Sequence, residues 1–174
     1  MTPTSPPRNA VRGPSLLRDA LWLGCLYTAL SLASIYVARQ PGTIAAVWLS
    51  NAVAAAFLVT APGRHIVPLL LTTASANFLA NVLWGDPWAL SLAFTVPNAI
   101  EVAMAGWLLR RSGQVTLFAA DHRSFLRVLV LGAFVPQMLG ATLGAALLRL
   151  LSFASFERVW LDWYIGSTVG AVAT

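Results

Sequence analysis

The chain has 174 residues, of which 58% are hydrophobic and only 10% are charged. An average soluble domain has roughly 25% charged residues, so the composition excludes an ordinary soluble globular protein. The formal net charge of +5 comes entirely from arginines that flank hydrophobic runs, which argues against nucleic acid as a partner and for membrane topology. We therefore predict an all-α fold, a polytopic transmembrane helical bundle whose main partner is the lipid bilayer.

The first segment, residues 1–15, is basic and rich in Pro and Ser, and it predicts a disordered cytoplasmic tail. The hydrophobic run Leu16–Ala38 exceeds the roughly 20 residues that cross a bilayer and is too long for a signal-peptide core. Further spans are predicted at Ile44–Ala61, Ile66–Trp84, Trp88–Leu109 and Phe125–Leu151, and a sixth begins near Trp160. The prediction is one integral membrane domain, residues 16–174, with about six spans.

The arginines predict the orientation of this domain. Eight of them fall on the side of the N-terminus and three on the other side, so the positive-inside rule places the N-terminus in the cytoplasm. The eight are Arg8, Arg12, Arg18, Arg64, Arg110, Arg111, Arg123 and Arg127, and the three are Arg39, Arg149 and Arg158.

The stretch TVPNAIEVAMAGWLLRR, residues 95–111, places a carboxylate inside a predicted span. Glu101 lies 13 residues after the outer end at Trp88, which is about 20 Å deep at 1.5 Å per residue. Asn98 shares its helix face, and Pro97 predicts a local kink. A carboxylate that faces lipid costs from about 2.5 to more than 10 kcal/mol, so we expect Glu101 to face the bundle interior.

Other amides lie at comparable depths. Asn77 and Asn81 share one face of the third span, and Asn51 lies about 10 Å below the outer end of the second span. If these faces converge, they form a polar cleft open to the outside, with Glu101 near its floor. The predicted ligand- or signal-sensing cleft consists of Asn98, Glu101, Asn51, Asn77, Asn81 and Trp48. The alternative is that these side chains only fix helix packing through hydrogen bonds between helices.

Two glycine pairs have the spacing that lets helix backbones approach closely. Gly140 and Gly144 form one pair, and Gly166 and Gly170 form the other. They predict helix packing within the bundle or, alternatively, a homodimer face.

The tryptophans at the span ends, Trp84, Trp88, Trp160 and Trp163, predict anchors in the membrane interface, with the lining of a cavity as the alternative. The single cysteine, the two widely separated histidines and the lack of a catalytic motif predict no metal, no cofactor and no enzymatic activity in this segment.

Four sequence blocks carry a family resemblance from about Ala45 to the end. They are AAVWLSNAVAAAFLV, LLLTTASANFLANVLWG, NAIEVAMAGWLLRR, and FLRVLVLGAFVPQMLGATLGAALL followed by WYIGSTVGA. In their order and spacing the chain resembles the bacterial membrane-associated sensor domain, type one. It departs at Ser50, where the family usually has Pro, and at Ser167, where an acidic residue is frequent.

The resemblance implies an input module of about eight spans in the bacterial inner membrane. In that family the module precedes a histidine kinase, diguanylate cyclase or cyclic-di-GMP phosphodiesterase domain. The sequence is then expected to be the front part of a longer dimeric receptor, cut within its sixth span. A stimulus or a small ligand of unknown identity would alter packing around Asn98 and Glu101. Two alternatives are a small transporter that uses Glu101, and a scaffold subunit that binds a membrane partner protein.

Overall fold

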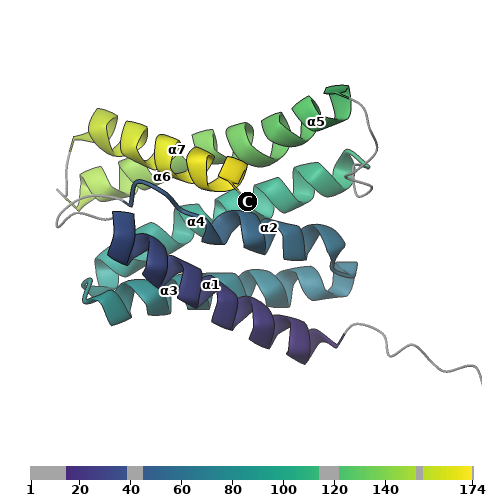
Figure 1. Ribbon diagram of the computed structural model, residues 1–174. Helices are drawn as coiled ribbons and strands as arrows, with labels where there is room; N and C mark the ends of the chain where they lie inside the picture. Colours follow the sequence, from purple (N-terminus) through teal and green to yellow (C-terminus); the bar gives the residue numbers. More distant parts are fainter. Residues whose placement is uncertain (1–14, 39–44, 114–121, 152–154, 174) are drawn as a thin grey trace, which may run out of the picture.

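The computed structural model describes residues 15–38, 45–113, 122–151 and 155–173, and every regular element within these ranges is helical. The elements are α1 (Leu16–Ala38), α2 (Ser50–Thr60), η1 (Gly63–His65), α3 (Ile66–Trp84), α4 (Trp88–Arg111), α5 (His122–Val128), η2 (Leu129–Phe134), α6 (Val135–Leu150) and α7 (Phe156–Ala173). Figure 1 shows α1 and α3 on one side of the bundle, α2 and α4 in the middle, and α6 and α7 on the other side. The all-α prediction is confirmed. The predicted tail, apart from Ser15, lies outside the described residues.

In the part of the chain that the structure describes, four helical stretches are long and apolar enough to cross a membrane. They are Leu16–Val37, Gly63–Trp84, Trp88–Arg111 and His122–Leu150, with 22 to 29 residues each. The shortest would extend about 33 Å, against a hydrocarbon core of roughly 30 Å. Helix α2 has 11 residues, and α7 has 18 with charged side chains in its first two turns. The chain is a multi-pass membrane protein.

The second predicted span differs from the structure in its first part. The sequence predicted one span over Ile44–Ala61, but the helix begins only at Ser50, and residues 45–49 are not helical. Non-helical backbone at membrane depth is tolerated where protein buries it and satisfies its polar groups. Here the Trp48 backbone N–H donates to the Gly166 carbonyl of α7 at 3.1 Å. Figure 1 shows this extended segment running to the start of α2 in the middle of the bundle.

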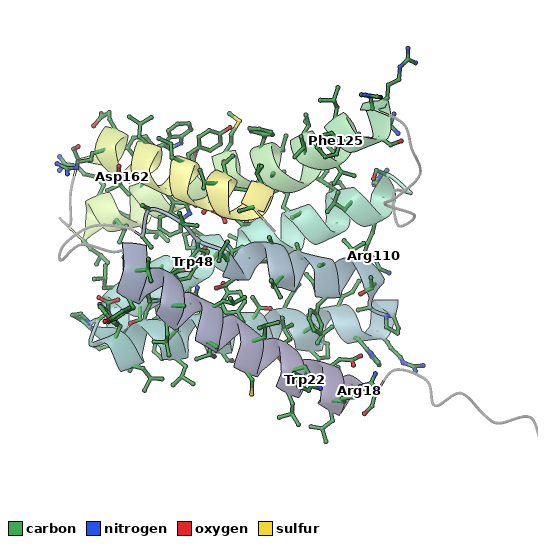
Figure 2. All side chains as sticks on the ribbon, in the orientation of Figure 1. Arg18, Trp22, Trp48, Arg110, Phe125 and Asp162 are labelled. Carbon is green, nitrogen blue, oxygen red and sulfur yellow. The ribbon has the colours of Figure 1, made fainter. Side chains whose placement is uncertain are left out.

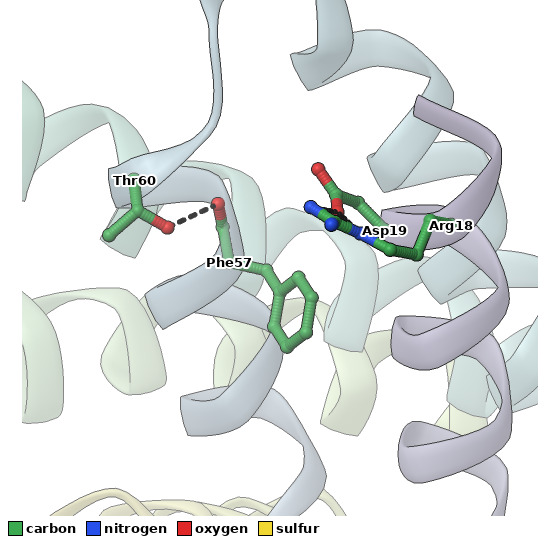
Figure 3. Close-up of polar contacts among 4 residues, drawn as sticks. All are labelled: Arg18, Asp19, Phe57 and Thr60. Atoms are coloured by element: carbon green, nitrogen blue, oxygen red, sulfur yellow. Dashed lines mark hydrogen bonds and ion pairs between the residues drawn. The ribbon is translucent and has the colours of Figure 1, made fainter. Parts of the chain in front are cut away.

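The C-terminal end of α2 is held by an arginine of α4. Arg110 Nη1 donates to the carbonyl oxygens of Leu58 and Ala61, at 2.8 and 2.6 Å. A cation at this end of a helix stabilises the partial negative charge of the last carbonyls. One turn earlier, the Thr60 hydroxyl donates to the Phe57 carbonyl at 3.2 Å (Figure 3). The C-terminal end of the short helix is therefore fixed by a contact with α4.

Charged side chains lie at both ends of the bundle, and Arg158 pairs with Asp162 of the same helix at 3.8 Å. Figure 2 shows Arg18 and Arg110 at one end and Asp162 at the opposite end. Arg18 pairs with its neighbour Asp19 at 3.2 Å in the first turn of α1 (Figure 3). Because the Arg18 side chain is exposed, this pair contributes little to stability.

Two apolar clusters make up most of the core. The first consists of Leu23, Tyr27, Ala54, Leu58, Leu69, Ala76 and Val102, from α1 to α4. The second consists of Ala93, Phe94, Ala141, Ala145, Leu148, Val159 and Trp163, from α4, α6 and α7. Helix α4 contributes to both clusters, and its polar residues lie where the two meet.

Candidate functional site

Glu101 lies in the middle of α4 and is 1% exposed. Its Oε2 accepts a hydrogen bond from Asn51 Nδ2 of α2 at 2.6 Å. Its Oε1 accepts from Trp163 Nε1 of α7 at 2.7 Å, and the Ser167 hydroxyl lies 3.5 Å from the same oxygen. On α6, a Cβ added at Gly140 would collide with the Glu101 side chain. One carboxylate thus joins α2, α4 and α7 and fills the space that a glycine leaves on α6.

Asn51 uses all of its hydrogen-bonding capacity in this arrangement. Its Oδ1 accepts from the Tyr27 hydroxyl at 2.6 Å and from Trp48 Nε1 at 3.2 Å. Its Nδ2 donates to Asn98 Oδ1 at 2.7 Å as well as to Glu101. An amide with two donors and two acceptor sites is fully satisfied by four such contacts. Asn51 lies in the first turn of α2, directly after the non-helical residues 45–49.

Asn77 extends the network to α3. Its Nδ2 donates to the Tyr27 hydroxyl at 3.1 Å. Its Oδ1 accepts from Asn81 Nδ2 at 3.2 Å and from the Thr95 hydroxyl at 3.0 Å. From Asn81 through Asn77, Tyr27 and Asn51, every donor therefore points along the chain of hydrogen bonds toward the carboxylate of Glu101. We call the side chains joined by these hydrogen bonds the Glu101 network. They are Tyr27, Trp48, Asn51, Asn77, Asn81, Thr95, Asn98, Glu101, Trp163 and Ser167.

Hydrogen bonds, rather than an ion pair with a cation, offset the cost of burying the Glu101 carboxylate. Among the described residues no arginine or histidine nitrogen lies within 4.0 Å of Glu101. Leaving one buried polar group unsatisfied costs about 1–3 kcal/mol, and more when the group is charged. Neutral N–H and O–H donors from α2 and α7 supply the missing hydrogen bonds. Removing one donor or moving one helix is therefore expected to change the hydrogen bonds of Glu101.

A small cavity borders the network on the side of α7. It has a volume of about 30 Å³ and is lined by Ile35, Ala45, Trp48, Asn81, Phe94, Asn98, Trp163 and Ser167. A water molecule needs roughly 10–15 Å³ of such space together with polar partners, so the cavity has room for water or a very small polar molecule. The sequence predicted an open polar cleft. In the structure the predicted residues form a hydrogen-bonded network, and the cavity beside it is far smaller than a typical ligand-binding cleft.

The structure brings together all six residues that the sequence assigned to the cleft. Asn51, Asn77, Asn81, Asn98 and Glu101 are each at most 4% exposed, and Trp48 is 9% exposed. Pro97 is buried within α4, whose helical assignment continues through it from Trp88 to Arg111.

Four side chains of the network were not assigned to the cleft from the sequence: Tyr27, Thr95, Trp163 and Ser167. Trp163 was predicted to anchor the domain in the membrane interface, with the lining of a cavity as the alternative. It is 3% exposed, lines the small cavity and donates to Glu101. Gly144 of α6 makes this possible, because a Cβ there would lie 2.6 Å from the Trp163 ring. Tyr27 was not singled out. Its signal was a phenol hydroxyl in the middle of the first span, since a buried tyrosine usually finds a hydrogen-bond partner.

The second glycine pair faces backbone rather than side chains. A Cβ at Gly166 would lie 2.6 Å from the Ala45 carbonyl oxygen, and one at Gly170 would collide with the backbone of Trp48. All four glycines of the two pairs thus contact other parts of the same chain. The extended segment lies directly against α7 because both glycines lack a side chain.

The family model MASE1 matches residues 19–174. The chain belongs to the MASE1 family. This agrees with the resemblance seen in the sequence, and a MASE1 domain is a membrane sensory domain rather than a catalytic one. The probable diguanylate cyclase DgcE of Escherichia coli (strain K12) is 22% identical over 160 residues, which cover 92% of this chain and 14% of that protein. No solved structure matches the chain.

Proposed function

We propose that this MASE1 domain is the transmembrane input module of a bacterial receptor in the inner membrane. It receives a membrane or periplasmic stimulus and passes it to a cytoplasmic output domain of the histidine kinase or cyclic-di-GMP type, within a dimer. The similarity to a probable diguanylate cyclase supports an output in cyclic-di-GMP signalling. The end of the bundle with Arg18 and Arg110 faces the cytoplasm in this proposal, in accordance with the positive-inside rule.

The observation that carries the proposal is the position of Glu101 between helices. Asn51 on α2 and Trp163 on α7 donate to different oxygens of the same carboxylate. A ligand, ion or proton that takes one oxygen weakens the tie to one helix and leaves the other tie in place. Such a stimulus shifts the bundle between two packings only by its difference in affinity for them.

Helix α7 is the element that such a shift would move. It is tied to α2 and α4 through Trp163, Ser167 and the hydrogen bond from the Trp48 backbone to Gly166. Its other large contact is with α6, where Trp163 lies over Gly144. Loss of the Glu101 contacts would therefore let α7 shift against α4, within the apolar cluster that α4, α6 and α7 share. This motion is the proposed signal.

Glu101→Gln in the full-length receptor tests the proposal. Glutamine keeps the shape of the side chain but presents an N–H group where Oε2 accepts from Asn51 Nδ2. We expect normal expression and a change in output activity of roughly tenfold, the equivalent of one lost charge-assisted hydrogen bond. The matched control is Glu157→Gln, the same change at an exposed position of α7, which should leave the output unchanged. A stable Glu101→Gln receptor with wild-type output under all stimuli would contradict the proposal.

A further inference from the structure

A groove lies near the end of the bundle that carries Arg110, away from the Glu101 network. It has a volume of about 390 Å³ and is lined by Leu58, Ile66, Ala103, Gly106, Trp107, Arg110 and Arg111. Its walls come from α2, α3 and α4 and are apolar except at the two arginines. The groove therefore combines a surface suited to a hydrocarbon chain with two guanidinium groups.

The positive charge of the groove is not neutralised within the described part of the protein. Arg110 uses Nη1 for the carbonyls at the end of α2. Arg111 lies over the Trp107 ring, with Cζ 5.3 Å from the ring centroid. In residues 15–38, 45–113, 122–151 and 155–173, no carboxylate oxygen lies within 4.0 Å of either guanidinium. An anion can thus approach both groups without displacing an ion pair.

The position of the groove along α4 matches the layers of a bilayer. Arg110 and Arg111 are in the last turn of this 24-residue helix. The helix extends about 36 Å, which exceeds the roughly 30 Å hydrocarbon core, so its last turn lies at the level of the lipid head groups. Ala103 and Gly106 are one to two turns deeper, at the level of the acyl chains.

We propose that this groove binds an anionic phospholipid, with its phosphate on Arg110 and Arg111 and an acyl chain along Ala103 and Gly106. Basic pockets between transmembrane helices suit anionic head groups, whereas a zwitterionic lipid brings its own cation to the same place. Because Arg110 also holds the end of α2, the lipid would contact the residue that fixes this helix. The proposal does not depend on the role of Glu101.

The test is native mass spectrometry of the full-length protein, titrated with phosphatidylglycerol or phosphatidylcholine of the same acyl chains. We expect phosphatidylglycerol to be retained preferentially. Arg111→Gln should weaken its retention about fivefold, the effect of one arginine near an anionic head group. Arg149→Gln, the same change at an exposed residue in the last turn of α6, is the matched control and should have no effect.

A second variant distinguishes lipid binding in the groove from lipid binding to a positively charged surface. Ala103→Phe fills the groove and keeps both arginines, so retention of phosphatidylglycerol should fall at least as much as in Arg111→Gln. Equal retention of the two lipids by the wild type, or equal effects of Arg111→Gln and Arg149→Gln, would overturn the proposal. So would normal retention by Ala103→Phe. If Ala103→Phe fails to fold, the comparison of the two arginine variants still decides.

Discussion

Gly140 and Gly144 on α6 have the same spacing as Gly166 and Gly170 on α7, but their surroundings differ. The α6 pair packs against side chains, with Glu101 at the first glycine and the Trp163 ring at the second. The α7 pair receives the backbone of the extended segment before α2. Small residues in membrane helices are usually explained by close helix–helix packing. Here the α6 pair makes room for the Glu101 network, and the α7 pair makes room for non-helical backbone.

This difference predicts different consequences for the same substitution. A side chain can rotate away from an added methyl group, whereas backbone that is held by hydrogen bonds cannot. Substitutions in the α7 pair should therefore act mainly on stability. Substitutions in the α6 pair should act mainly on the contacts of Glu101 and on signalling.

Gly170→Ala should have the largest effect on stability. Its Cβ would collide with the backbone of Trp48, so the extended segment must leave α7. We expect a loss of about 3 kcal/mol, at the upper end of the range for overpacked cores. The free energy of unfolding can be measured by SDS titration in mixed micelles. Gly63→Ala is the control, because nothing lies within 4 Å of the added Cβ. A Gly170→Ala variant as stable as this control would show that the segment does not pack as described.

Gly144→Ala should have an intermediate effect. The added Cβ would lie 2.6 Å from the Trp163 ring, a rigid group that is also hydrogen-bonded to Glu101. Moving the ring weakens this hydrogen bond, so we expect a loss of about 2 kcal/mol together with an altered output. Trp163→Phe should then cost less free energy of unfolding in the Gly144→Ala variant than in the wild type. An equal cost in both would show that the ring has not moved.

Gly140→Ala should have the smallest effect on stability and still change the signal. The added Cβ meets Glu101, whose side chain has rotatable bonds and can move. We expect a loss of about 1 kcal/mol and an output change comparable to that of Glu101→Gln. The measurement pairs SDS unfolding with output activity for both variants. A stability loss as large as that of Gly170→Ala, with a normal output, would remove the distinction between the two pairs.

Much of the helix pattern could be predicted from the sequence. The bounds of the first and third spans, Leu16–Ala38 and Ile66–Trp84, match α1 and α3 because Pro and Gly mark the turns between long apolar runs. The start of α2 could not be predicted. The side chains of residues 45–49 suit a buried helix and a buried extended segment equally well. The choice depends on a hydrogen bond to Gly166, which is more than 100 residues away in the chain.

The polar residues of the site were predictable by kind and depth. The free-energy cost of polar groups in lipid indicates that Glu101 and the asparagines avoid it. The helix period places Asn98 beside Glu101. The pairing of donors and acceptors was not predictable, because it depends on how helices are rotated against one another. Trp163 shows this most clearly. A tryptophan near the start of a span is typical of an interface anchor, and only the position of α6 shows that it points inward.

The contact between Glu101 and Asn51 is tested most directly by exchanging these two partners in the full-length receptor. Glu101→Gln and Asn51→Asp each disrupt the hydrogen bond between α4 and α2, the first by opposing two N–H groups and the second by bringing two carboxyl groups together. In the double variant, the glutamine can donate to the aspartate. We predict that both single variants lose the wild-type output and that the double variant regains part of it, with a coupling energy of about 1–3 kcal/mol. Wild-type output in the single variants, or strictly additive losses in the double variant, would contradict this prediction.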